Sequence, residues 1–186
     1  MNIDGLFLEL VPHCASVSRN GWAADHSVRP LSPLGHEQAR ALVTGIGTDV
    51  AAVYSSPTLR CRQTVAPLSD ATHRSVEDLP ELIETDDFAE PAEWIGGVFA
   101  PIAEAIRGAW AAGRGLRALR IMADRHRGQR IVAASHGDII PALLATLCAG
   151  YDLPLPGVVP RGGWYTIRIG TGQCTIEART IDSPVT

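Results

Sequence analysis

Three short apolar runs, each followed by a helix-like pattern, constrain the fold of this 186-residue chain most strongly. The runs cover residues 6–11, 51–54 and 131–134, and each is followed directly by proline or serine. Their length and apolar character predict buried strands. Strands that alternate with helices pair in parallel, so the sequence predicts a three-layer α/β/α domain around a mainly parallel sheet.

Local signals predict where the helices begin and end. Ser32 and Pro33 suit the N-cap and first turn of the first helix. One face of this helix would carry four apolar residues, Ala39, Leu42, Val43 and Ile46. The second helix is expected over about residues 57–68. The third would begin near residue 139 and end at Gly150, a natural place for a left-handed cap.

The remaining segments fit one domain over residues 1–186. Residues 70–128 are rich in alanine and mostly helical in pattern, which predicts a helical insert or lid after the second strand. Residues 164–169 and 174–180 flank a Gly-Thr-Gly turn. They predict a C-terminal hairpin at the edge of the sheet.

Composition narrows the classes of function. The formal net charge is −4 and the ten aromatic residues are scattered, which disfavours nucleic acid as a partner. No apolar stretch is long enough to span a membrane, and no export signal opens the chain, so no membrane partner is expected. The four cysteines show no Cys-x-x-Cys spacing, so neither a zinc knuckle nor a redox pair is indicated. A reducing cytoplasm is the expected location.

Two histidines and an arginine follow the ends of the predicted strands. His13 follows the first strand, Arg60 lies one turn beyond the second, and His136 follows the third. In open parallel sheets, ligands bind where the C-terminal ends of the strands converge. Arginine matches the geometry of phosphate oxygens, and imidazole can attack phosphorus or stabilise negative charge. The sequence therefore predicts a phosphate site.

A carboxylic acid would complete this chemistry by donating a proton to the leaving oxygen. Glu84 and Asp138 are candidates, although either could be a solvated surface charge. Neither they nor the two histidines show the paired helical spacing of a metal site. A cysteine-phosphatase loop from Cys14 to Arg19 is disfavoured, because four residues separate them and none is glycine.

Four blocks of sequence resemble the histidine phosphatase superfamily, which includes the cofactor-dependent phosphoglycerate mutases. They are residues 11–16, 29–39, 54–64 and 135–144. The resemblance implies a phosphoglycerate mutase-like fold without metal or cofactor. It also implies that His13 is the nucleophile, that His136 is the second pocket histidine and that Arg60 binds phosphate. Gly137 is expected to contact the substrate beside His136.

The implied activity is a metal-independent phosphatase that hydrolyses a phosphomonoester or phosphohistidine through a phosphohistidine intermediate on His13. Glu84 falls roughly where many members place the proton donor. The series Arg19, Trp22, Asp25 and Arg29 is similar to the small branch containing phosphohistidine phosphatases of the SixA type. The expected partner is therefore a phosphorylated small molecule or a phosphohistidine protein.

Two positions depart from the pattern of the superfamily. Pro12 stands where the arginine before the nucleophile is expected, and Cys14 replaces the usual glycine. Proline supplies neither a guanidinium nor an amide hydrogen, so a weak or specialised phosphatase is expected. Arg19 or Arg62 could substitute. A binding or scaffold protein without turnover, or an enzyme repurposed for a non-phosphoryl reaction, are the alternatives.

Overall fold

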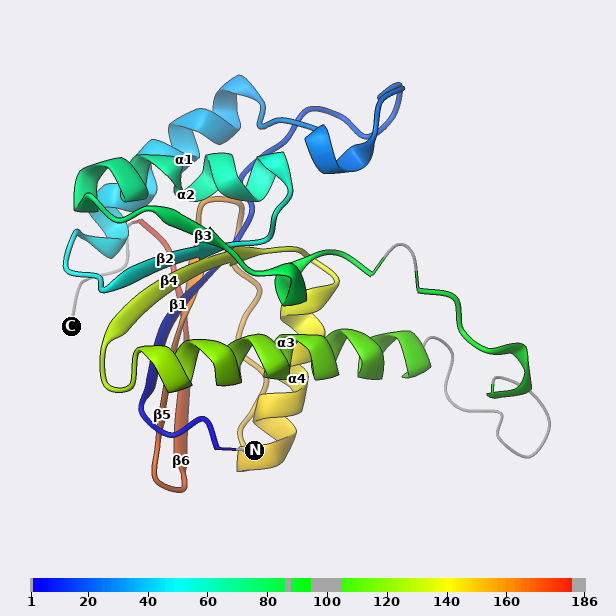
Figure 1. The fold of residues 1–186 in the computed structure, drawn as a ribbon, viewed down its shortest axis with the longest axis vertical. Helices are drawn as coiled ribbons and strands as arrows, with labels where there is room; N and C mark the ends of the chain where they lie inside the picture. Colours follow the sequence, from blue (N-terminus) through cyan, green and yellow to red (C-terminus); the bar gives the residue numbers. More distant parts are fainter. Residues whose placement is uncertain (1, 86–87, 95–104, 182–186) are drawn as a thin grey trace.

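A six-stranded sheet forms the centre of the protein, as the computed structural model shows for residues 2–85, 88–94 and 105–181 (Figure 1). The strands are β1 (Leu6–Pro12), β2 (Ala52–Ser55), β3 (Val76–Asp78), β4 (Arg130–Ser135), β5 (Trp164–Gly170) and β6 (Gln173–Arg179). Their order is β3-β2-β4-β1-β5-β6. The first four of these are mutually parallel, whereas β5 runs antiparallel to β1 and forms a hairpin with β6. The predicted parallel sheet and edge hairpin are confirmed.

Two pairs of helices cover the two faces of the sheet (Figure 1). They are α1 (Pro33–Ile46) and α2 (Leu59–Thr72) on one face, and α3 (Ala105–Arg125) and α4 (Ile139–Tyr151) on the other. Each face buries its own apolar cluster, centred on Leu42 and Val65 for the first pair and on Leu119 and Leu143 for the second. The predicted three-layer architecture is confirmed. No helix of the described ranges is long and apolar enough to cross a membrane.

Some boundaries differ from the prediction. Strand β3 lies inside the segment 70–128 that was expected to be mostly helical. The sequence does not predict this strand, because its three residues include exposed Glu77 and Asp78 and so form no apolar run. The helix α3 packs on α4 and the core as part of a layer. Residues 86–87 and 95–104 of the predicted insert or lid lie outside the described residues. The predicted Gly150 cap is wrong, since α4 continues to Tyr151 and Asp152 adopts the left-handed conformation with φ 54°.

The register of the sheet aligns the ends of three strands. Pro12 of β1 pairs with Ser135 of β4, and Ser55 of β2 pairs with Ala134 of β4. The backbone N–H of His13 donates to Ser135 O at 2.9 Å, which extends the ladder by one residue. Residues that follow β1, β2 and β4 therefore emerge at the same edge of the sheet.

The loop after β1 lies against the N-terminus of α1. Ser32 caps the helix by accepting from the Gly35 N–H at 3.2 Å, as predicted, and its own backbone N–H donates to Ala15 O at 2.9 Å. A Cβ at position 35 would lie 1.9 Å from that same carbonyl oxygen. Glycine is therefore required at position 35 for the close approach that fixes the loop after His13.

A Gly35→Ala substitution is expected to destabilise the fold by about 2 kcal/mol, because the added methyl group must push the loop away from the helix. Gly113→Ala is the matched control, since position 113 lies within α3 and has no atom within 4 Å of the added Cβ. That variant should be stabilised by about 0.5–1 kcal/mol. Urea denaturation monitored by circular dichroism measures both, and equal stabilities for the two variants would contradict the close-contact argument.

Candidate active site

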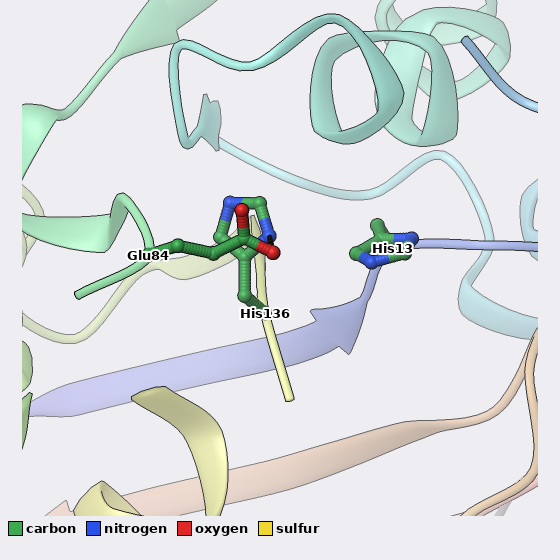
Figure 2. Close-up of side chains that lie close together, drawn as sticks. All are labelled: His13, Glu84 and His136. Atoms are coloured by element: carbon green, nitrogen blue, oxygen red, sulfur yellow. Dashed lines mark ion pairs between the residues drawn. The ribbon is translucent and has the colours of Figure 1, made fainter. Parts of the chain in front are cut away.

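The rings of His13 and His136 lie close together in an edge-to-face arrangement at the C-terminal edge of the sheet. Their centroids are 5.5 Å apart, and the ring planes are inclined by 64°. His13 follows β1 directly and His136 follows β4 directly, and both side chains are buried. Figure 2 shows the Glu84 carboxylate against the His136 ring, with the His13 ring opposite. The structure thus brings together three residues that are far apart in the sequence.

His13 is held in one tautomer by its backbone surroundings. Its Nδ1 lies 2.8 Å from Cys14 O, and a carbonyl can only accept, so Nδ1 carries the hydrogen. Nε2 is then the unprotonated nitrogen with an available lone pair. Burial, followed by the positive charges of Arg161, His136 and Arg60, lowers the pKa of His13 to about 3, although the bond to Cys14 O opposes this. His13 is therefore a neutral imidazole near neutral pH.

His136 has the opposite protonation state. Its Nε2 lies 2.8 Å from Ser56 Oγ and 3.4 Å from Cys61 Sγ, and its Nδ1 lies 3.2 Å from Glu84 Oε1. Burial lowers the pKa of His136, but the contacts with Cys61 and Glu84 outweigh it and raise the pKa to about 9. The ring is therefore an imidazolium near neutral pH. The pair combines one neutral and one cationic imidazole.

Arg60 lies in the first turn of α2 and is fully buried. Its Nη1 donates to His26 O at 2.6 Å, and its Nη2 forms an ion pair with Glu84 Oε2. Nη2 also lies 3.4 Å from His136 Nδ1. Its Nε is buried and has no hydrogen-bond partner among the described residues. A buried guanidinium with an unused donor is suited to an additional anionic ligand.

The Glu84 carboxylate lies between the two cationic side chains, Arg60 and His136. Burial raises the pKa of its carboxyl, but the bonds and charges of His136 and Arg60 outweigh this and lower the pKa to about 2. The adjacent Thr85 fixes the segment, because its N–H and Oγ1 donate to Asp138 Oδ2 at 2.8 and 2.9 Å. Asp138 also caps α4. Of the two acids considered from the sequence, Glu84 thus lies in the site and Asp138 supports it.

The sequence as a whole matches a known family. A sequence profile described as the histidine phosphatase superfamily (branch 1) covers residues 13–182. The chain belongs to this superfamily. A search of curated proteins found no significant match.

Several solved structures of phosphatases share the fold of this chain. A mutant phosphoserine phosphatase from Entamoeba histolytica, in complex with phosphoserine, superposes with a TM-score of 0.69 and 16% identity, covering 95% of this chain and 98% of the other. The alpha-ribazole phosphatase from Shigella flexneri gives 0.66 and 18%, covering 97% and 100%. The protein histidine phosphatase SixA with tungstate gives 0.59 and 20%, covering 95% and 97%. At these identities the similarity shows the fold.

Two further arginines lie at the site and were not singled out as site residues from the sequence. Arg29 precedes α1, is buried, and donates from Nη1 to Val17 O at 2.7 Å. Its Nε is a second buried donor without a partner in the described part of the chain. Burial and then the charge of Arg60 lower the pKa of Arg29. Arg161 comes from the loop before β5 and donates from Nη1 to His13 O.

The other predicted residues lie farther from the paired rings. Arg19 is on an exposed bend, where its charge acts on Arg29. Arg62, considered as a substitute for the missing guanidinium, forms an exposed ion pair with Asp78 instead. Gly137 follows His136 at the surface and lines a hollow that also includes Pro12 and Arg161. The signal that could have identified Arg29 was its place in the second block, beside the first turn of α1.

The same cluster is also the group of potential metal ligands. One ligand atom each of His13, Glu84 and His136 lies within 4.8 Å of the others. However, Arg60 pairs with the carboxylate, and the raised pKa of His136 leaves no lone pair on its ring near neutral pH. Arginine charges nearby repel a cation and attract an anion. The donor set therefore fits an oxyanion better than a metal ion.

Proposed function

We propose that this chain is a metal-independent phosphatase that hydrolyses a phosphomonoester or phosphohistidine through a phosphohistidine intermediate on His13. The observation that carries the proposal is the pairing of two imidazoles, 5.5 Å apart, with opposite protonation states. A neutral imidazole can attack, and a cationic one can stabilise the charge that develops. Environments that separate two pKa values in this way commonly mark an acid and a base with different roles.

Binding of a phosphoryl group uses the buried donors of the site. Arg60 and Arg29 each hold a guanidinium Nε without a partner in the described residues, and His136 adds a cationic N–H. A phosphoryl dianion replaces the Glu84 carboxylate as the partner of Arg60 and His136. Charge-assisted bonds of this kind are each worth about 1.5–3 kcal/mol. The released carboxylate is then close to the ligand.

The reaction proceeds in two steps. His13 Nε2 donates its lone pair to phosphorus, and the bond from phosphorus to the leaving atom breaks. This atom is oxygen in a phosphomonoester and nitrogen in a phosphohistidine, and Glu84 supplies the proton that it takes up. Water then attacks the phosphohistidine, the P–N bond breaks, and Glu84 accepts the proton from the water. The lowered pKa leaves Glu84 ionised near neutral pH, so its role as an acid requires that the phosphoryl charge raise this pKa after binding.

The site and the solved neighbours support the proposed substrate class. The solved neighbours are named for phosphoserine, alpha-ribazole phosphate and protein phosphohistidine, all of which present a terminal phosphoryl group. A panel of phosphorylated metabolites, one aryl phosphate and one phosphohistidine protein, assayed for phosphate release in the presence of a chelator, tests the proposal. Turnover of at least one of them is expected. Loss of turnover in Cys14→Ser combined with retention in His13→Ala would assign the chemistry to a thiol and overturn the proposal.

One observation favours a second candidate. Pro12 offers no guanidinium immediately before His13, so a protein that binds an oxyanion but does not turn over is the alternative. Such a protein would be thermally stabilised by phosphate or vanadate, yet release no phosphate from any substrate of the panel. An enzyme that catalyses a non-phosphoryl reaction in the same pocket is the third hypothesis. It predicts that phosphate inhibits that reaction and that phosphorylated compounds are not substrates.

The pKa of His136 predicts an alkaline limit to activity. As pH rises through about 9, His136 loses its proton and kcat/KM is expected to fall. The raised pKa also stabilises the fold, and this stabilisation is complete below about pH 6.5 and lost as pH rises through about 9. Phosphatase assays and urea denaturation between pH 6 and 10 measure both effects. A fall in kcat/KM centred near pH 7 would contradict the prediction that His136 is cationic at neutral pH.

A further inference from the structure

We propose that Arg161 is a substrate-binding residue of this site, and that its guanidinium holds the phosphoryl group beside His13. The inference rests on the proposed function for the identity of its ligand. Arg161 reaches His13 from the opposite end of the sequence, with its Nη1 donating to His13 O and lying 3.3 Å from His13 Nδ1. Since His13 Nδ1 already donates to Cys14 O at 2.8 Å, the bond to the carbonyl is the one that holds Arg161.

The topology of the sheet explains why this loop arrives at the site. In a parallel pair, the second strand begins beside the start of the first strand. In contrast, β5 is antiparallel to β1. The start of β5 therefore lies beside the end of β1, and Arg161 stands three residues before Trp164, where β5 begins. The ladder between β1 and β5 ends at Leu10 and Tyr165, which leaves the Pro12 side of the strand open. Arg161 lies at this opening.

A tight turn holds Arg161 in place. The Gly163 N–H donates to Pro160 O at 2.9 Å, and Gly162 has φ +88°, as the third residue of a type II turn requires. A Cβ at Gly163 would lie 2.8 Å from Arg179 O, so the turn packs closely against β6. Arg161 thus occupies the second position of a defined turn. Because the backbone is already ordered there, ligand binding does not have to pay the entropy of ordering it.

The guanidinium keeps donors for a ligand. Among the described residues its hydrogen-bond contacts are those with His13, so Nη2 and Nε have none. The side chain is on the exposed rim and lines a hollow with Pro12 and Gly137, so that a phosphorylated molecule can reach it. Pro12 contributes no donor to that hollow. The charge of Arg161 acts on both His13 and Arg29, which places it in the same cationic cluster.

Phosphate and vanadate binding to Arg161→Gln tests the inference without depending on turnover. The affinity for phosphate, measured by titration calorimetry, is expected to fall about 10- to 100-fold, as for the loss of one charge-assisted contact. Arg161→Lys should recover part of it, because lysine keeps the charge but not the planar pair of donors. The matched control is Arg168→Gln, since Arg168 lies on β5 and stacks 4.3 Å from the Phe7 ring on another part of the surface. Its affinity should stay within about twofold of wild type.

A purely structural role for Arg161 predicts a different result. If it only held the His13 carbonyl, Arg161→Gln would lower the melting temperature of the free protein but leave phosphate affinity unchanged, and this would overturn the inference. Wild type that binds neither phosphate nor vanadate would overturn it as well. Arg161-dependent binding without turnover on any substrate would support the inference while rejecting the proposed phosphatase. Turnover that is unaffected in Arg161→Gln would reject Arg161 alone.

Discussion

Replacement of His13 by alanine is expected to lower kcat/KM by at least about a thousandfold, because loss of the proposed covalent nucleophile removes the reaction path itself. No other described group presents an unprotonated imidazole nitrogen at this position of the site. The fold should persist, since the His13 side chain contributes a single hydrogen bond to a backbone carbonyl besides its contact with Arg161. Steady-state assays on the best substrate of the panel measure the effect.

The matched control for this variant is His73→Asn. His73 is an exposed histidine at the end of α2 with φ 54°, a conformation that asparagine tolerates, so activity should stay near wild type. Rapid acid quench with a labelled substrate should show a phosphoenzyme in wild type and none in His13→Ala. Turnover above one tenth of wild type in His13→Ala would rule out His13 as the nucleophile.

Replacement of Arg60 by glutamine should have the second-largest effect. Arg60 is fully buried between Glu84 and His26 O, and it faces the proposed phosphoryl position. The loss of one donor that acts on the transition state costs on the order of a hundredfold or more in rate. Stability should also fall, by about 1–3 kcal/mol, because the carboxylate of Glu84 loses its guanidinium partner. Activity assays and urea denaturation separate the two consequences.

Two companion variants keep this prediction falsifiable. Arg125→Gln removes an exposed ion pair with Glu77. Its activity should stay within about twofold of wild type, and its free energy of unfolding should change by no more than about 0.5 kcal/mol. The double variant Arg60→Gln with Glu84→Gln removes both charges and should recover stability without recovering phosphate binding. Recovery of binding in the double variant would show that Arg60 serves only to neutralise Glu84.

The sequence predicts the central part of the site for a geometric reason. Parallel strands end at one edge, so residues that follow three strands must converge, and His13 and His136 do so with Arg60. Glu84, one of the two candidate proton donors in the sequence, also lies in the site beside His136. Its role as a proton donor remains a prediction.

The parts that could not be predicted depend on long-range packing. The loop that carries Arg161 belongs to an antiparallel strand, and only the pairing of β5 with β1 shows that it returns to the site. The short strand β3 has too few buried residues to produce an apolar run. The opposite protonation states of the two histidines depend on the burial of His13 and on contacts with Cys61, Glu84 and Arg161, none of which a local pattern encodes.

The Glu84 carboxylate between Arg60 and His136 gives the pocket a counter-ion of its own. Any incoming anion must therefore compete with a resident negative charge that is tethered to the protein. A sulfate ester or a phosphodiester carries one negative charge, so it would replace the single negative charge of Glu84 without a gain in charge. A phosphomonoester brings two, so the exchange itself selects for the more highly charged ester.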